Sequence, residues 1–206
     1  RIFDGDKGPN TGGMGTYAPA PVLTDTLRDE AMKTILEPMV AAMEKEGMPY
    51  VGCLYAGLMI TPQGPKVVEF NARFGDPETQ VVLPLLDSDL GQIMMACATG
   101  TLTADMVKWK DSSAACVILA SKGYPEISSK GDVLHGDIKQ HDTTIVFHSG
   151  TKLVGDEYVT NGGRVLGVVG LGKDLRTALD RAYGRIEHID FEGMQYRTDI
   201  GAKAFK

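Results

Sequence analysis

Apolar residues recur at helical spacing in the first third of the chain and predict a helix there. Thr24 or Thr26 can cap the helix N-terminus, and Gly47 followed by Pro49 provides its end. Pro38 lies inside the pattern and should kink or split the helix, because proline lacks the N–H that a helix interior needs. We expect the stripe to be core rather than a methionine cofactor site; its members are Leu27, Met32, Ile35, Leu36, Met39, Val40 and Met43.

Two further helices are predicted by the same criterion. Ser88 or Asp89 opens the first of them, which ends at Gly100. Its apolar positions are Leu90, Ile93, Met94 and Cys97. The second is expected over Leu175 to Ile189, with one buried face formed by Leu175, Leu179, Ala182, Ile186 and Ile189.

Short apolar runs predict strands. Residues 50–61 and 66–71 flank Pro62-Gln63-Gly64-Pro65, so we expect a hairpin whose strands lie in a covered sheet. After Leu102 the apolar runs are short and separated by polar turns; they span residues 114–120, 144–148 and 164–171. We therefore expect an α+β chain with a boundary near residues 101–111 and a mostly β domain after it.

Glycine is over-represented and is concentrated near the beginning of the chain. The sequence contains 25 glycines in 206 residues, about 12% against a usual share of roughly 7%. Residues 5–21 hold five of them together with three prolines, which predicts a shaped loop instead of a helix. Glycines 12, 13 and 15 flank Met14, and such a loop can bring backbone N–H groups close to an anion. The alternative is a tight connection before a helix.

Charge and composition exclude several classes of function. With 27 acidic and 21 basic residues the formal charge is −6, which provides no electrostatic footprint for nucleic acid or an anionic membrane. The longest apolar stretch, residues 51–60, is far shorter than the roughly 20 residues of a membrane span. Three widely spaced cysteines predict free thiols in a reducing, cytoplasmic compartment. The chain begins at Arg1, and we expect it to be part of something longer.

Candidate chemistry is concentrated in residues 66–78. Residues two apart in a strand share a face, so Glu69, Asn71 and, if the strand persists, Arg73 would form one polar row. A carboxylate and an amide oxygen suit Mg²⁺, and an adjacent arginine can grip a phosphoryl or acyl phosphate oxygen. Val68 and Phe70 would face the other side and bury the strand. The alternative is an ordinary solvated face of a hairpin. The four histidines show no metal spacing.

Five strings of this sequence carry a family resemblance: Gly8-Pro9-Asn10-Thr11-Gly12-Gly13-Met14-Gly15, Tyr55-Ala56-Gly57-Leu58-Met59, Glu69-Phe70-Asn71-Ala72-Arg73-Phe74-Gly75-Asp76-Pro77-Glu78-Thr79-Gln80, His148-Ser149-Gly150-Thr151 and Thr160-Asn161-Gly162-Gly163-Arg164-Val165-Leu166. They resemble the phosphoribosylamine-glycine ligases, or glycinamide ribonucleotide synthetases, of the ATP-grasp superfamily. The resemblance extends over essentially the whole chain but corresponds to the C-terminal part of those enzymes.

The resemblance implies a reaction and a set of roles. In this family ATP and Mg²⁺ or Mn²⁺ phosphorylate glycine to glycyl phosphate, and the amine of 5-phosphoribosylamine displaces the phosphate. Glu69 and Asn71 are then the metal ligands and Arg73 the catalytic residue. The implied substrate-binding residues are Gly12, Gly13, Met14, Gly15, Arg73, Gly75 and Asp76. Residues 1–105 would be the C-terminal half of an ATP-grasp domain, and residues 106–206 a small β-rich, barrel-sandwich-like domain.

Two departures limit what the resemblance implies. Many ATP-grasp enzymes carry an extra metal-binding carboxylate on the preceding strand, where this chain has residues 54–58 without one. The N-terminal substrate domain and the lysine and adenine contacts are absent from these residues, so the missing N-terminal part is an expected partner. We expect the chain alone to be inactive. Another ATP-grasp carboxylate-amine ligase or carboxylase, or a non-catalytic binding module, remains an alternative.

Overall fold

The structure is a computed structural model that describes residues 1–205, and the chain forms two compact units. The first unit contains residues 1–19, 76–85 and 110–206, and the second contains residues 20–75 and 86–109. This division differs from the single boundary expected near residue 105. Residues 1–19 belong with the C-terminal part because strand β1 (Gly15–Ala18) pairs with strand β4 (Ser113–Ala120).

The first unit is built on a four-stranded antiparallel sheet. The strand order is β1-β4-β9-β6, with β6 over Thr144–His148 and β9 over Arg164–Gly172. The predicted runs therefore coincide with strands to within a residue. All eight residues of β4 are buried. Such a continuous apolar run is typical of a strand covered on both faces.

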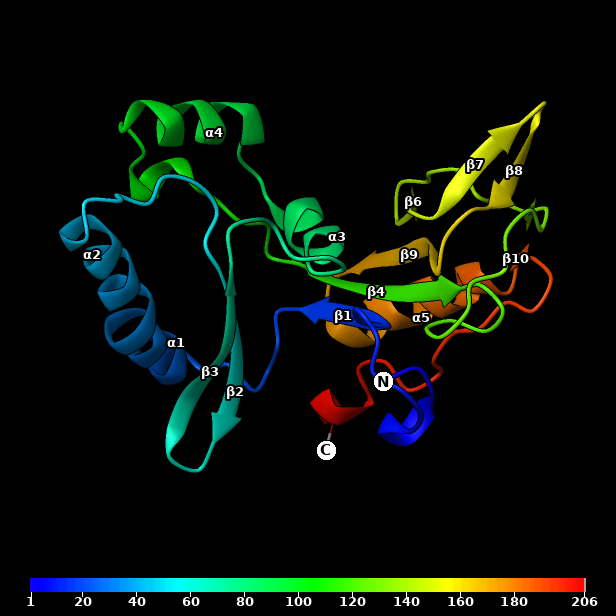
Figure 1. Cartoon of the computed structure of the whole chain (residues 1–206), viewed down its shortest axis with the longest axis horizontal. Coiled ribbons are helices and arrows are strands. Elements are labelled where there is room, and N and C mark those ends of the chain that lie inside the picture. Colours follow the sequence, from blue (N-terminus) through cyan, green and yellow to red (C-terminus); the bar gives the residue numbers. More distant parts are fainter. Residues whose placement is uncertain (206) are drawn as a thin grey trace. The chain divides into compact units, whose positions relative to one another are not determined.

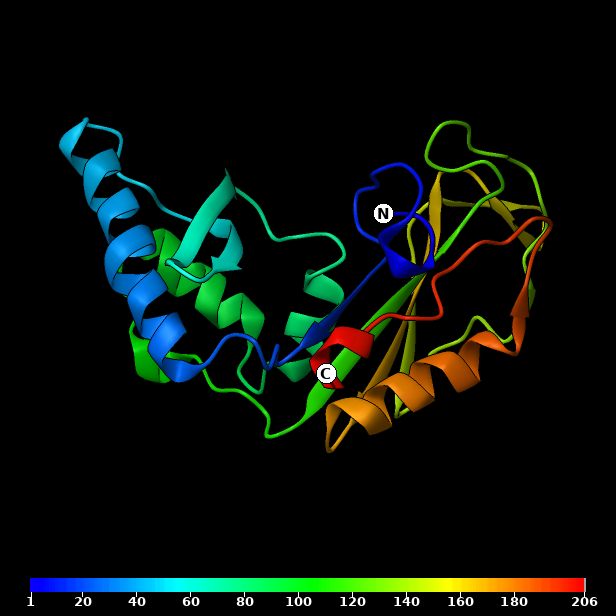
Figure 2. The same cartoon turned by 90° about the horizontal axis from the view of Figure 1, so that it is seen from below.

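Helices cover the two faces of this sheet in register with the β4 side chains. Cys116 and Ile118 pack in one cluster with Val81 of helix α3 (Thr79–Val82). Val117 and Leu119 pack in another cluster with residues of helix α5 (Leu175–Ile186), which runs along the sheet in Figure 2. Alternation along β4 therefore divides the core into two layers.

Helix α5 begins where a capping residue allows it and ends earlier than predicted. The Asp174 carboxylate accepts a hydrogen bond from the Thr177 N–H at 2.8 Å, as an N-cap does. Ile189, predicted as the last helical residue, is buried instead in strand β10 (Ile189–Asp190), which pairs with β5 (His135–Gly136). A Cβ at Gly170 would lie 2.0 Å from the carbonyl oxygen of Ala178, so glycine is what lets the helix backbone approach β9.

An arginine ties the two ends of the chain together inside the first unit. Arg197, 7% exposed, donates hydrogen bonds to the carboxylates of Asp199 at 2.7 Å and Asp6 at 3.0 Å. The hydrogen bond from Arg197 lowers the pKa of Asp199 far below its usual value. The remaining elements of this unit are β7 (Thr151–Val154), β8 (Glu157–Thr160) and the 3₁₀ turns η1 (Asp4–Asp6), η3 (Leu83–Leu85) and η5 (Ala202–Phe205).

The second unit begins with the predicted helix, whose backbone stays helical from Asp25 to Lys45 and contains a π-helical turn before Pro38, so Pro38 does not split it. Helix α1 (Asp25–Ala31) is capped by Thr24, whose hydroxyl accepts from the Leu27 N–H. A π-helical turn, η2 (Met32–Leu36), separates α1 from α2 (Glu37–Lys45), and the Glu37 N–H bonds to the Met32 carbonyl. The wider turn ends two residues before Pro38, whose missing N–H removes one donor from the regular hydrogen-bond ladder.

The apolar stripe of this helix pair is less buried than predicted. Met32 and Val40 are 42% and 41% exposed, so for these two side chains the prediction of a core position is wrong. Leu27, Ile35, Leu36, Met39 and Met43 are half-buried. No other layer within the described residues covers the whole stripe.

A hairpin and a second helix complete the second unit. Strands β2 (Tyr55–Thr61) and β3 (Gly64–Asn71) pair around a turn at residues 62–63, which confirms the hairpin (Figure 1). The covered sheet is not found at Met59, Val67 and Val68, which are 58%, 43% and 67% exposed. Helix α4 (Leu90–Thr99) has the predicted Asp89 cap and ends at Gly100; the 3₁₀ turn η4 (Ala104–Met106) follows.

Helices and strands are mixed in both units, so the α+β class is confirmed. Among residues 1–205, no helix combines the length and apolar character needed to cross a lipid bilayer.

Candidate functional site

Glu69 and Asn71 lie on the same face of β3, as predicted. Glu69 pairs with Gly57, Phe70 with Ala56 and Asn71 with Tyr55, so alternation is uninterrupted between the two polar residues. A Cβ at Gly57 would lie 3.1 Å from Cγ of Glu69, and the glycine therefore leaves space beside the carboxylate side chain. The strand holds a carboxylate and a carboxamide side by side.

A β-bulge directly before this pair changes the side-chain pattern. The register passes from Gly57 opposite Glu69 to Leu58 opposite Val67, so Val68 is the extra residue. The prediction that Val68 buries the strand is wrong, because this side chain is 67% exposed. Phe70 is half-buried. The bulge breaks the strict alternation on which the prediction rested.

Arg73 does not continue the polar row. Strand β3 ends at Asn71, and Arg73 lies in the following bend. Its guanidinium donates a hydrogen bond to the carbonyl oxygen of Phe74 at 2.8 Å. The row was predicted on the condition that the strand persists, and in the structure it does not.

The donor set at Glu69 and Asn71 fits a hard cation that takes few protein ligands. Glu69 is exposed, and Nδ2 of Asn71 is buried without a hydrogen-bond partner. This NH₂ group is a hydrogen-bond donor and would need an acceptor oxygen, whereas a cation would bind the Oδ1 oxygen of Asn71. No cluster of three His, Cys, Asp or Glu side chains with metal-binding geometry occurs in residues 1–205. Mg²⁺ can be held by one or two protein ligands when phosphate oxygens and water complete its shell.

The glycine loop lies in the first unit and is largely tied down. Gly12 donates its N–H to the Tyr124 hydroxyl at 3.1 Å, and Gly13, with φ of +108°, donates to the hydroxyl of Thr11. The Met14 side chain is buried in the core, and Gly15 begins strand β1. The backbone of Gly12 and Gly13 is therefore the part of the loop that lies outside the sheet.

Arg164 is the residue that sequence reasoning missed in this region. Its Nη1 donates to the carbonyl oxygens of Gly12 and Asp76, each at 2.9 Å, and its Nη2 donates to the Asp76 carboxylate at 2.9 Å. The Asp76 carboxylate also accepts from Gln80 at 2.9 Å. One guanidinium thus joins the glycine loop to the turn that carries Asp76. The sequence feature that could have pointed to Arg164 is its position directly after the turn Asn161-Gly162-Gly163, at the start of an expected strand.

The predicted site residues are divided between the two compact units. Glu69, Asn71, Arg73 and Gly75 belong to the second unit, whereas the glycine loop and Asp76 belong to the first. Within the first unit the structure brings Gly12 and Asp76 together through Arg164. Within the second it brings Glu69 and Asn71 together on β3.

Comparison with protein families gives two matches, separated by residues 80–113. Residues 1–79 match the ATP-grasp (A) domain of phosphoribosylglycinamide synthetase, and residues 114–203 match the C domain of the same family. The chain belongs to the phosphoribosylglycinamide synthetase family. The first match contains Glu69, Asn71 and Arg73, and the second contains Arg164.

Relatives of this synthetase family are similar along the whole chain. A phosphoribosylamine-glycine ligase of Caulobacter vibrioides is 52% identical over 209 residues, with 100% of this chain and 49% of that protein covered. A trifunctional purine biosynthetic protein adenosine-3 of Gallus gallus is 50% identical, with 99% of this chain and 20% of that protein covered. The chain spans about half the length of the ligase.

Solved structures similar to this chain include a member of the synthetase family. The crystal structure of phosphoribosylamine-glycine ligase from Thermotoga maritima is 35% identical, with a TM-score of 0.84 over 97% of this chain and 49% of that one. The biotin carboxylase domain of a Hydrogenobacter thermophilus 2-oxoglutarate carboxylase, in complex with MgADP, ADP and bicarbonate, has a TM-score of 0.65 at 14% identity and covers 89% of this chain and 40% of that one. The latter likeness concerns the fold alone.

Proposed function

We propose that this chain supplies part of the active site of an ATP-dependent ligase that joins glycine to 5-phosphoribosylamine through glycyl phosphate. The observation that carries the proposal is the family match over residues 1–79, which includes the paired Glu69 and Asn71 on β3. The 52% identity to a phosphoribosylamine-glycine ligase supports the same substrates. The missing partner is then the remaining half of the enzyme, and nucleic acid and membranes have no part in the reaction.

The proposed roles follow the chemistry of the side chains at Glu69, Asn71 and Arg73 and of the backbone in the glycine loop. Glu69 and Asn71 bind Mg²⁺ or Mn²⁺ through their carboxylate and carboxamide oxygens. The bound metal with ATP supplies the phosphoryl group and neutralises the charge that develops during its transfer. Arg73 contacts the transferred phosphoryl or a substrate oxygen, for which its planar fork is suited. Gly12, Gly13, Met14, Gly15, Gly75 and Asp76 bind substrate, and the Arg164 contacts hold Gly12 and Asp76 in position.

Compartment and domain division are part of the same proposal. Three free cysteines fit the reducing cytoplasm, where de novo purine synthesis would place the enzyme. Residues 1–105 and 106–206 would correspond to the end of an ATP-grasp domain and to a small β-rich, barrel-sandwich-like domain.

The first test is an assay of the chain alone. We expect no ADP release that depends on both glycine and 5-phosphoribosylamine, because half a cleft cannot hold the reactants in attack geometry. Turnover similar to that of the Caulobacter vibrioides relative would contradict the proposed dependence on the other half.

The second test uses a chimera in which this chain replaces the matching half of that relative. We expect Glu69→Ala to lower kcat at least about a hundredfold at saturating Mg²⁺. We expect Arg73→Lys to be slow as well, because a lysine keeps the charge of the arginine but not its planar pair of donors. Glu46→Ala, at an exposed position after α2, is the matched control. A normal rate for Glu69→Ala would overturn the metal assignment, and dependence on a carboxylate other than glycine would favour another ATP-grasp ligase.

A further inference from the structure

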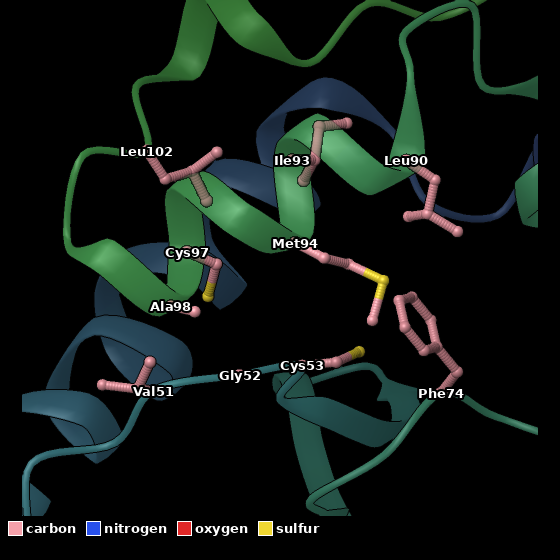
Figure 3. Close-up of a pocket in the computed structure, with 10 residues that line it drawn as sticks. All are labelled: Val51, Gly52, Cys53, Phe74, Leu90, Ile93, Met94, Cys97, Ala98 and Leu102. Atoms are coloured by element: carbon pink, nitrogen blue, oxygen red, sulfur yellow. The ribbon is translucent and has the colours of Figure 1, made fainter.

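A pocket of about 310 Å³ lies in the second unit between helix α4, the segment before β2 and Phe74 (Figure 3). Its wall consists of Gly52 and of apolar and sulfur-bearing side chains, none of which carries a charge. Figure 3 shows the Cys53 sulfur directed toward Met94 and Phe74. Such a wall offers few of the directed polar contacts that orient a substrate with phosphate and amine groups. The polar contacts that bear on the proposed reaction in the first unit lie around the glycine loop.

The backbone after β4 places Tyr124 beside this loop. Strand β4 ends at Ala120, and the N–H of the buried Ser121 donates to the carbonyl oxygen of Gly163 at 2.8 Å. The Tyr124 N–H donates to the Ser121 carbonyl oxygen at 3.2 Å and closes a turn. The backbone of Tyr124 is therefore anchored by contacts that do not involve the glycine loop.

Gly163 makes room for the Tyr124 ring. A Cβ at Gly163 would lie 2.2 Å from Cδ2 and 2.6 Å from Cε2 of Tyr124, so the missing side chain is what allows the ring to lie there. Arg164 follows Gly163 directly in the sequence. This short segment therefore brings two side chains to the glycine loop, the Arg164 guanidinium directly and the Tyr124 phenol by leaving space for it.

Tyr124 and Arg164 hold the two peptide groups that flank Gly12. The Tyr124 hydroxyl accepts the Gly12 N–H at 3.1 Å, and Nη1 of Arg164 donates to the Gly12 carbonyl oxygen at 2.9 Å. Glycine loses more conformational freedom on ordering than any other residue. A substrate that had to order an unrestrained Gly12 would bind more weakly, because its binding would pay for the lost freedom.

We propose that Tyr124 is a positioning residue for substrate binding, and that its hydroxyl holds the Gly12 peptide in the binding conformation before the substrate arrives. The inference rests on the proposed function for the identity of the substrates, glycine and 5-phosphoribosylamine. Tyr124 acts through Gly12 and lowers the KM of the substrate that the loop contacts. The phosphoryl-transfer step is unaffected, because Glu69 and Asn71 belong to the other unit.

Hydrogen exchange on the chain itself tests the contact. Tyr124→Phe removes the acceptor but keeps the ring, so we expect the Gly12 amide to exchange about tenfold faster, as the loss of one ordinary hydrogen bond predicts. Gly163→Ala displaces the ring and should give the same acceleration, and the double variant should be no faster than either single variant. Tyr158→Phe, at an exposed position of β8, is the matched control and should leave exchange at Gly12 unchanged.

The chimera with the Caulobacter vibrioides relative tests the consequence for substrate binding. We expect Tyr124→Phe to raise the KM of glycine or of 5-phosphoribosylamine about tenfold, with kcat within about threefold of the parent value. A role in folding alone would instead reduce the active fraction, and with it kcat, at an unchanged KM. Thermal unfolding of each variant checks that it folds.

Two results would overturn the proposal. The first is unchanged exchange at Gly12 in both Tyr124→Phe and Gly163→Ala. The second is unchanged KM values in a chimera whose glycine loop exchanges faster. A parent chimera without glycine-dependent ADP release would contradict the proposed function and the identity of the substrates, whereas exchange at Gly12 decides separately whether Tyr124 holds the loop.

Discussion

The two compact units differ most in how much of their apolar surface is buried. Nearly all buried apolar side chains lie in the first unit, where β4 is sealed between α3 and α5. In the described part of the second unit, the buried apolar residues are Ala31, Pro65 and Ala96. Its larger apolar side chains, such as Val68 and Met95, are 67% and 65% exposed.

The difference separates two properties that a hydrophobic pattern combines. Periodicity tells which face of an element is apolar, and it does so equally well in α5 and in the α1–α2 pair. Whether that face is covered depends on other parts of the structure. The first unit closes a core around β4, whereas the second presents apolar faces and a pocket.

The largest effect is expected at a close backbone contact between β9 and α5 in the first unit. Gly170→Ala places a Cβ against backbone atoms of α5, so we expect a loss of more than about 4 kcal/mol in the free energy of unfolding. Gly184→Ala is the control, since this exposed glycine of α5 has open space around it and should gain up to about 1 kcal/mol. Urea denaturation followed by circular dichroism measures both. Equal stabilities for the two variants would contradict the close packing.

The next variants compare one large side chain from each unit. Leu119→Ala removes a fully buried side chain of β4 and should cost about 2–5 kcal/mol. Met95→Ala, at an exposed position of α4, should cost less than about 0.5 kcal/mol. Hydrogen exchange by mass spectrometry separates the effects on the two units. A comparable loss at Met95 would mean that this face of the second unit is covered in solution.

A pH titration measures how much the ion pair between Arg197 and Asp199 contributes to the stability of the first unit. Arg197 lowers the pKa of Asp199 in the folded state below its unfolded value of about 3.9, so the stabilisation is present above that pH and is lost as the pH falls. Arg197→Gln should cost about 1.5–3 kcal/mol at pH 7, with a smaller gap at pH 3. Thermal unfolding at both pH values checks this. If the difference in stability between the parent chain and Arg197→Gln grew on acidification, the ion pair with Asp199 would not be its cause.

The smallest effect concerns the position of the glycine loop. Arg164→Lys cannot reproduce the contacts to Gly12 and Asp76, and we expect about 1 kcal/mol less protection of the amides around Gly12 from hydrogen exchange. Arg28→Lys is the control, because this arginine makes exposed ion pairs with Asp25 and Asp29 in the second unit. Unchanged exchange in Arg164→Lys would show that the loop is held by its other contacts.

Local signals predicted the elements that depend on neighbours in sequence. Thr24, Asp89 and Gly100 act as caps because capping involves residues within one turn. Strand β1 was not predicted inside the glycine-rich segment, because its pairing partner β4 lies about 100 residues away. Its four residues carry no strong alternation of their own.

The candidate site was predictable in type but not in arrangement. The shared face of Glu69 and Asn71 follows from strand alternation alone, whereas their role as metal ligands was implied by the family resemblance and stays a prediction. The bend at Arg73 and the bulge at Val68 depend on where pairing with β2 ends and shifts, which composition does not specify. Arg164 was missed because its partners Gly12 and Asp76 are 152 and 88 residues away in the chain.

The division of the first unit into three chain segments has a consequence for how the protein folds. Its sheet needs β1 from residues 1–19, yet β4 and β9 follow only after the second unit has been traversed. Contacts of such long range close large loops, which slows folding. During synthesis β1 stays unpaired until β4 has been made. A shortened chain that starts at residue 106 would lack β1 and α3 and would leave one face of β4 open, so the C-terminal half should fold poorly when expressed by itself.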